Sequence, residues 1–266
     1  MSAVTTAEPP VLNVAGLRKS FGGVRVLHDF GLVIPAQSQT CVAILGQNGA
    51  GKTTLLNLIT RLVPADAGTI EVFGHDVFAG GARHLASYGV ARTFQSPRLL
   101  LDDSCLNNVA LGALSVRRGW EGGHAAAIRR AAEALDRVGL AAHVGRMAGS
   151  LPFGSRKLVE LARALALRPR LLLLDEPAAG LSDLEEHRLA DVLTGLTDSG
   201  ITLLLIEHRM ALVAATARRV VMMDGGRIVF DGRAADAIAS PLVRERYLGA
   251  GFDRVGPAGH EGSERT

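Results

Sequence analysis

The 266-residue sequence contains few aromatic residues, few cysteines and few lysines. Phe, Trp and Tyr together make up 4% of the chain, and the only lysines are Lys19, Lys52 and Lys157. Positive charge therefore rests mainly on scattered arginines, and 29 Lys+Arg against 26 Asp+Glu give a formal net charge of +3. Because no basic block or arm is present, the sequence argues against a nucleic-acid partner.

Disulfide, secretory and membrane-spanning classes are also disfavoured. Cys41 and Cys105 are too few for a disulfide framework and lie at no metal-ligand spacing, so we expect a reducing compartment. Residues 1–10 lack the basic and apolar regions of a signal peptide and are expected to be flexible. The most apolar runs, residues 171–174 and 201–206, are far shorter than the roughly 20 residues of a membrane-spanning helix. Any membrane role would thus require a partner.

Short apolar runs alternate with longer amphipathic ones. Four runs are typical of buried strands, namely residues 40–45, 171–174, 201–206 and 219–223. Their alternation with helical segments predicts an α/β fold with a mainly parallel sheet covered by helices. Residues 12–17 and 27–34 alternate apolar and polar side chains on either side of Phe21-Gly22-Gly23, which predicts an N-terminal antiparallel β subdomain.

Two segments, residues 125–138 and 155–167, have apolar side chains at helical spacing. Between Phe94 and Ser150 the strand-like runs stop, so we expect an inserted helical subdomain over about residues 96–160. One domain spanning residues 11–248 accommodates all of these elements. The glycine-, proline- and charge-rich residues 249–266 are expected to form a disordered tail.

The strongest motif is an uninterrupted G-x-x-x-x-G-K-T that follows the strand-like residues 40–45 and precedes a helical run. This is a P-loop in its required context, where successive backbone N–H groups and a helix N-terminus surround a polyphosphate. The expected nucleotide-binding residues of the loop are Gly46, Gln47, Asn48, Gly49, Ala50, Gly51, Lys52, Thr53 and Thr54. We expect Lys52 to reach the β- and γ-phosphates and the Thr53 hydroxyl to bind Mg²⁺.

A P-loop also needs a carboxylate near the metal, and the apolar run 171–174 ends in Asp175-Glu176-Pro177. Asp175 is the candidate on the metal side. Glu176 lies one residue further, where the strand gives way to a loop, and is placed to polarise the attacking water as a general base. Without the P-loop, an acidic strand end would be structural about as often as functional.

Residues 151–165, LPFGSRKLVELARAL, precede this strand and resemble the signature segment of ATP-binding-cassette (ABC) proteins. Four further matches occur in the family's order: Phe21 resembles the A-loop aromatic, Gln95 the Q-loop, residues 180–183 the D-loop and His208 the switch histidine. The resemblance covers roughly residues 11–248 and implies a P-loop NTPase core of the ABC type.

The resemblance also implies roles for these residues. Gln95 would contact Mg²⁺ and the attacking water, and His208 would hydrogen-bond the γ-phosphate. Leu151, Gly154, Ser155 and Asp183 would contact nucleotide from the signature and D-loop side. Phe21 would stack on adenine, although an aromatic beside a Gly-Gly turn is also often plain core, and both interpretations stay open.

The signature segment departs from the family's familiar Leu-Ser-Gly-Gly-Gln, with Pro152 for serine, Phe153 for the first glycine and Ser155 for glutamine. No hydroxyl can act from position 152. What remains is Gly154 and the N-terminus of the predicted helix 155–167, whose free N–H groups can still face a phosphate. We expect this helix end to make the contact, with Ser155 as a substitute donor.

The resemblance extends to a subgroup. Residues 89–95 (GVARTFQ), 177–181 and 241–249, together with the Leu-Pro-Phe-Gly form of the signature, are similar to the ATP-binding subunits of branched-chain amino-acid importers. This implies ATP and Mg²⁺ as ligands and a second ABC ATPase subunit, in a homo- or heterodimer. It further implies two transmembrane permease subunits and, indirectly, an extracytoplasmic solute-binding protein. The chain would then be cytoplasmic, on the inner face of the membrane.

Three alternatives stay open at this point. Closely similar subunits serve urea or amide importers, and the ATPase itself does not touch the solute. A soluble, non-transport ABC ATPase is disfavoured because the chain has no coiled-coil insertion, second cassette or basic arm. A small-molecule kinase on a P-loop scaffold ranks last, since it would leave the signature, Gln95 and His208 without a role.

Overall fold

The computed structural model describes residues 8–36, 40–79, 82–114, 123–240 and 243. Most of the N-terminus that we expected to be flexible (residues 1–10) and all of the expected tail (residues 249–266) lie outside the described residues. In the described part the strands are β1 (Leu12–Phe21), β2 (Val24–Ile34), β3 (Cys41–Gly46), β4 (Ala67–Val72), β5 (His75–Asp76), β6 (Val90–Arg92), β7 (Leu171–Asp175), β8 (Thr202–Ile206), β9 (Arg219–Asp224) and β10 (Arg227–Arg233).

The helices of the same residues belong to two kinds. The α-helices are α1 (Lys52–Ile59), α2 (Ala82–Ser87), α3 (Cys105–Leu114), α4 (Gly123–Arg137), α5 (Phe153–Leu165), α6 (Asp183–Asp198), α7 (Met210–Thr216) and α8 (Ala234–Ala239). Two short 3₁₀ helices are η2 (Ala141–His143) and η3 (Ala148–Ser150). None of these helices is long and apolar enough to cross a membrane.

A six-stranded sheet with the order β10-β9-β3-β8-β7-β6 forms the centre of the described molecule. β3 pairs in parallel with β8 and β9, and β7 pairs in parallel with β6 and β8. β10 pairs with β9 in the antiparallel direction. A second, four-stranded sheet with the order β2-β1-β4-β5 is antiparallel. The expected combination of a mainly parallel core sheet and an N-terminal antiparallel sheet is therefore confirmed.

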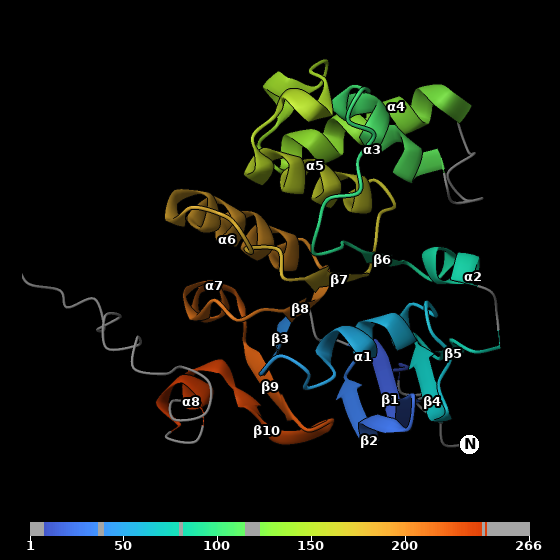
Figure 1. Cartoon of the computed structure of the whole chain (residues 1–266). Helices are drawn as coiled ribbons and strands as arrows, with labels where there is room; N and C mark the ends of the chain where they lie inside the picture. The colour runs from blue at the N-terminus through green and yellow to red at the C-terminus, as the bar shows by residue number, and fades with distance from the viewer. Residues whose placement is uncertain (1–7, 37–39, 80–81, 115–122, 241–242, 244–266) are drawn as a thin grey trace, which may run out of the picture.

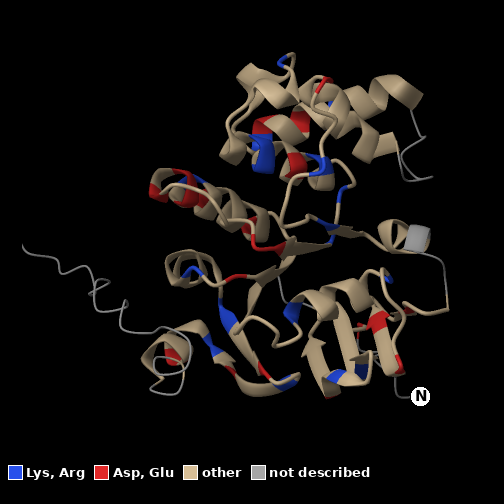
Figure 2. Ribbon diagram, viewed as in Figure 1, with Lys and Arg blue, Asp and Glu red and all other residues tan. Residues whose placement is uncertain are grey.

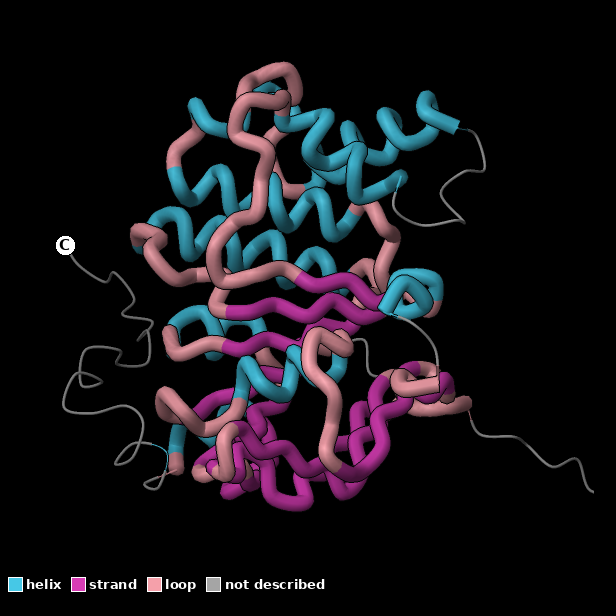
Figure 3. Tube along the Cα trace, turned by 45° about the vertical axis from the view of Figure 1, so that its right-hand side comes forward, coloured by secondary structure: helices cyan, strands magenta, loops and turns pink. Residues whose placement is uncertain are grey.

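The parallel sheet is buried on both faces. In β7, Leu171 and Leu173 belong to a core formed with α1 and the antiparallel sheet, whereas Leu172 and Leu174 belong to a core formed with α3 to α7. The three layers are visible in Figure 1 and, turned by 45°, in Figure 3. Because neither face of the sheet is in contact with water, the sequences of these strands are continuous apolar runs.

The helices α3, α4 and α5 pack against one another above the central sheet in Figure 1. The fully buried Asn108 of α3 holds the segment that leads into this helical part. Its side-chain Nδ2 donates to Leu100 O at 2.9 Å and its Oδ1 accepts from Leu100 N at 2.8 Å. The inserted helical subdomain expected from the sequence is thus present, while its boundaries at about residues 96–160 stay a prediction.

Candidate nucleotide-binding site

The P-loop joins the end of β3 to the start of α1. At Gly46 an added Cβ would overlap the carbonyl oxygen of Met223 in β9. At Gly51, which precedes α1 and has a φ of 98°, an added Cβ would lie 2.9 Å from Leu27 Cδ2. Both positions need glycine because a Cβ would not fit there. Gly51 also needs it for its left-handed backbone. Packing therefore enforces the glycine spacing of the motif.

Lys52, the first residue of α1, turns back onto the loop. Its Nζ donates to Gly46 O at 2.6 Å and to Gln47 O at 3.0 Å. Burial lowers the pKa of Lys52, and the charges of Glu176 and Asp175 oppose that change. The ammonium is thus held over the loop by carbonyl oxygens, which phosphate oxygens are able to replace.

A cavity of about 310 Å³ opens over the loop. It is lined by Val26, Asn48, Gly49, Gly51, Lys52, Thr53, Thr54 and Glu176. The structure thereby brings Glu176 of the loop after β7 to the phosphate-binding loop.

Val26 of β2, which also lines this cavity, was not predicted from the sequence, because nothing in the residue pattern of its strand marks it. Figure 2 shows the positive charge at the start of α1 and the negative charge at the end of β7 on neighbouring elements.

Asp175, at the end of β7, forms a buried ion pair with Arg92 of β6. Arg92 Nη2 lies 2.9 Å from Asp175 Oδ2, and each side chain is 6% exposed. The other guanidinium nitrogen, Nη1, donates to Asn57 Oδ1 at 2.7 Å and to Thr60 Oγ1 at 3.0 Å. Burial raises the pKa of Asp175, and the hydrogen bond and charge of Arg92 oppose that shift. Sequence reasoning missed this role of Arg92, because Asp175 lies 83 residues away along the chain.

Glu176 adopts a left-handed backbone with a φ of 47°, which is rare for a residue with a side chain. Its Oε2 accepts from Gln95 Nε2 at 2.7 Å. Its carbonyl oxygen accepts from Lys157 Nζ of α5 at 3.0 Å, and the next carbonyl, Pro177 O, accepts from the same nitrogen at 3.1 Å. The structure therefore brings two predicted catalytic residues, Glu176 and Gln95, into direct contact.

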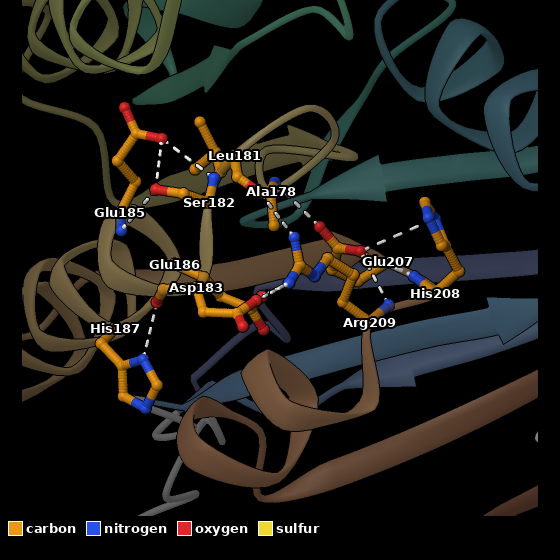
Figure 4. Close-up of polar contacts among 10 residues, drawn as sticks. All are labelled: Ala178, Leu181, Ser182, Asp183, Glu185, Glu186, His187, Glu207, His208 and Arg209. Carbon is orange, nitrogen blue, oxygen red and sulfur yellow. Dashed lines mark hydrogen bonds and ion pairs between the residues drawn. The ribbon is translucent and has the colours of Figure 1, made fainter. Parts of the chain in front are cut away.

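The third predicted catalytic residue, His208, lies in the loop between β8 and α7, and its side chain is 60% exposed. The fully buried Glu207 organises this loop. Glu207 Oε2 accepts from His208 N at 2.7 Å and from Arg209 N at 3.0 Å, and Oε1 accepts from Ala178 N at 2.9 Å (Figure 4). Sequence reasoning gave Glu207 no role, although an acid at the end of buried β8 repeats the position of Asp175 at the end of β7.

The signature segment lies on α5. The helix begins at Phe153, two residues earlier than predicted, because Pro152 serves as its N-cap. Gly154 and Ser155 are thus in the first turn, where N–H groups have no partner within the helix. The two residues line a cavity with other residues of α5 and α6 and with residues outside these helices, among them Phe94, Pro177 and Leu181; the P-loop does not contribute to it. Leu151, by contrast, is buried in the core.

Asp183 opens α6, directly after the N-cap Ser182. Ser182 Oγ and the Glu185 side chain form a reciprocal capping box. The Asp183 side chain is 90% exposed and lies 2.9 Å from Arg209 Nη2. Two groups of predicted site residues thus emerge: the P-loop residues with Gln95, Asp175 and Glu176, and a second group at the starts of α5 and α6. His208, between β8 and α7, and Phe21, at the end of β1, belong to neither group.

Phe21 is the last residue of β1 and its side chain is exposed, with 47% of its surface accessible. This excludes the interpretation of Phe21 as plain core. The Lys19 ammonium lies 5.1 Å from the ring centroid. Phe21 does not line the cavity over the P-loop. An adenine ring stacked on Phe21 would therefore lie outside that cavity.

A P-loop at the end of a parallel strand, with an acidic strand end beside it, defines a P-loop nucleotide-binding protein. Residues 31–179 match the family model described as "ABC transporter". The chain is 32% identical to the high-affinity branched-chain amino acid transport ATP-binding protein BraF of Pseudomonas aeruginosa over 252 residues, which cover 90% of this chain and 98% of that protein. The chain belongs to the ABC transporter family and is one of its ATPases.

Other relatives and solved structures agree with this assignment. LivG of Escherichia coli K12, a protein of the same description, is also 32% identical, with the same 90% and 98% coverage. The aliphatic sulfonates import ATP-binding protein SsuB of Cupriavidus necator is 38% identical over 92% of this chain and 74% of its own length.

Among solved structures, a nucleotide-free ATP-binding cassette from an ABC transporter superposes with a TM-score of 0.79, at 28% identity over 91% of this chain and all of that one. The ADP conformation of an ATP-binding cassette gives a TM-score of 0.78, at 29% identity over 91% of this chain and 99% of that one. The fold is therefore that of an ABC ATPase, and the kinase alternative is excluded.

Proposed function

We propose that this chain hydrolyses ATP to drive an importer of branched-chain or other hydrophobic amino acids, working through partner permease subunits. The observation that supports the ATPase chemistry most directly is the hydrogen bond between Gln95 and Glu176 beside the P-loop cavity. The relatives BraF and LivG, matched over 90% of the chain, support the substrate class.

In the proposed reaction, the P-loop N–H groups and Lys52 bind the β- and γ-phosphates. Glu176 accepts a proton from the attacking water, and the Gln95 amide, which donates to Glu176, fixes the orientation of that carboxylate. His208 would hydrogen-bond the γ-phosphate once its exposed side chain meets the ligand. Phe21 would stack on the adenine ring.

Mg²⁺ fits the oxygen donors proposed for it: the Thr53 hydroxyl, the Gln95 amide oxygen and the Asp175 carboxylate. In the described residues no cluster of three or more His, Cys, Asp or Glu side chains is arranged to hold a metal by itself. Such a sparse set suits a cation that binds mainly nucleotide phosphates and water. When bound, Mg²⁺ would neutralise charge on the phosphate oxygens.

A second ABC ATPase subunit would complete each nucleotide site. Within one chain, Gly154 and Ser155 line a cavity separate from the P-loop cavity, as expected if they act on nucleotide held by a partner. We propose a homo- or heterodimer, attached to two permease subunits at the inner face of the cell membrane, with an extracytoplasmic solute-binding protein delivering the solute.

The solute is tested by purification from native membranes. The tagged chain is extracted in mild detergent, co-purifying proteins are identified by mass spectrometry, and the complex is assayed in proteoliposomes with radiolabelled leucine. Two multi-span subunits and ATP-dependent leucine uptake support the proposal. Uptake of an alkanesulfonate but not leucine would move the assignment to the class of SsuB, which is 38% identical to this chain. Uptake of urea or an amide, or recovery with soluble partners alone, would contradict it.

The ATPase mechanism is tested with Glu176→Gln. We expect the variant to bind ATP, to lose turnover and to accumulate as a dimer, because the closed state can no longer hydrolyse its nucleotide. Size-exclusion chromatography with light scattering, with and without ATP, measures the accumulation of the dimer. Turnover at the wild-type rate would contradict the assignment of Glu176 as general base.

A further inference from the structure

Arg209 connects the loop that carries His208 to the segment that opens α6 (Figure 4). Its backbone N–H and that of His208 both donate to Glu207 Oε2, at 3.0 and 2.7 Å. The guanidinium reaches in the other direction, where Nη1 donates to Leu181 O at 2.8 Å and Nη2 to Asp183 Oδ1 at 2.9 Å. One residue thus holds two segments that both carry predicted nucleotide-site residues.

The contact is partly buried and extends to a second carboxylate. Arg209 Nη2 also forms an ion pair with Glu186 of α6, and the Glu186 side chain is only 5% exposed. Arg209 itself is 28% exposed. A planar guanidinium can meet a carbonyl and two carboxylates at once, which a lysine ammonium on a flexible stem does less well.

Glu207 provides a second, independent connection between the same parts of the chain. It is fully buried, and its Oε1 accepts from Ala178 N in the loop between β7 and α6. The switch loop is therefore joined to the β7–α6 connection at Ala178 by Glu207 and at Leu181 and Asp183 by Arg209. Only the Arg209 connection reaches the exposed Asp183.

We infer that Arg209 is a positioning residue that makes residues 181–186 and the loop bearing His208 move as one unit when ATP closes the proposed dimer. This inference rests on the proposed ATPase function. The side chains of both His208 and Asp183 are exposed. A connection between them ties the placement of the switch histidine to the placement of the D-loop.

The competing explanation is that Arg209 only neutralises the buried Glu186. Removing the cation alone would leave Glu186 charged and unpaired, which destabilises the fold. Two variants avoid this problem. Arg209→Lys keeps a cation near Glu186 but loses the planar fork, and Arg209→Met combined with Glu186→Gln removes both charges. Arg218→Ala, an exposed arginine just beyond the far end of α7, serves as control.

Steady-state ATP hydrolysis, thermal unfolding and the coupling to His208 are measured on the full chain. We expect both variants to melt near the wild-type temperature and to lose kcat by roughly tenfold, with a much smaller change in KM for ATP. His208→Ala is then combined with each variant. The combined variant should have the same kcat as His208→Ala alone, since the substitutions at Arg209 and at His208 act on the same loop. The control Arg218→Ala should hydrolyse ATP like the wild type.

Wild-type kcat in both variants would overturn the inference and leave Arg209 as a counter-ion of Glu186. A loss of kcat that adds fully to that of His208→Ala would overturn it as well. A wild-type chain without ATPase activity would instead contradict the proposed function, and the inference would fall with it.

Discussion

Arg92 and Asp175 form an ion pair across neighbouring strands, with both side chains 6% exposed. The Arg92 guanidinium also donates to Asn57 of α1 and to Thr60, the C-cap of that helix. It thereby joins the P-loop helix, the strand that leads to Gln95 and the carboxylate proposed to lie near Mg²⁺. Arg92 occupies Asp175 Oδ2 and leaves the other carboxylate oxygen for a different partner.

We predict that Arg92→Met destabilises the protein strongly. The substitution leaves Asp175 buried without its cation, and breaking such a pair typically costs about 3–5 kcal/mol. Urea denaturation measures the free energy of unfolding. The double variant Arg92→Met/Asp175→Asn should recover part of the loss, because it no longer buries an unpaired charge.

The matched control is Arg18→Met on β1, where the ion pair with Asp29 is exposed, at 51% and 54%. Solvent screens such a pair, so this variant should lose little stability. Equal losses in Arg18→Met and Arg92→Met would contradict the role assigned to burial.

Phe21→Ala should raise KM for ATP while leaving kcat nearly unchanged. Stacking of a base on an aromatic side chain contributes about 1–3 kcal/mol, which corresponds to roughly 5- to 150-fold in affinity. Phe21→Tyr should preserve binding. Val24→Ala is the control, because Val24 pairs with Phe21 across the β1–β2 turn and is also exposed. An unchanged KM in Phe21→Ala would remove Phe21 from the nucleotide site.

Gly154→Asp should abolish turnover, whereas Ser155→Ala should lower it modestly. A Cβ at Gly154 would overlap the Glu185 carboxylate that caps α6 and would lie 3.1 Å from Leu181 Cδ2. Ser155→Ala removes only a side-chain donor, and the backbone N–H groups at the start of α5 remain. Gly195→Asp on α6, where an added Cβ meets open space, controls for a new charge. Equal turnover in the two signature variants would contradict this view.

The apolar runs in the sequence are strands of the central sheet because both sheet faces are buried. β6 escaped prediction because it spans only Val90–Arg92 and contains an arginine. β10 escaped as well, because its residues are alternately exposed and half-buried, and none of them is fully buried. Length and burial thus decide which strands a pattern of hydrophobicity can reveal.

The motif residues were predictable because their spacing along the chain carries the chemistry. Their partners were not, since the contacts join distant positions: Arg92 and Asp175 are 83 residues apart, and Arg209 and Asp183 are 26 apart. The exposure of Phe21 likewise depends on the packing of the β1–β2 turn. Such relationships arise from the tertiary fold and leave no periodic signal.

The last prediction concerns Cys41 of β3, which is fully buried beneath α7. Burial raises the pKa of its thiol from 9.0 to about 12, against a smaller opposing effect of a hydrogen bond with Thr216. In the unfolded chain the thiol ionises near its ordinary pKa. Its contribution to stability is therefore fully present below pH 9.0 and is lost as the pH rises toward about 12.

Urea denaturation of the wild type and of Cys41→Ala at several pH values between 8 and 11 isolates this effect from other titrating groups. The cavity left by the substitution lowers stability by an amount that does not depend on pH. Above pH 9, the advantage of the wild type over the variant should shrink, by at most about 1.4 kcal/mol for each pH unit. A difference that stays constant across this range would mean that the folded protein admits the thiolate, and that solvent reaches β3 from the α7 side.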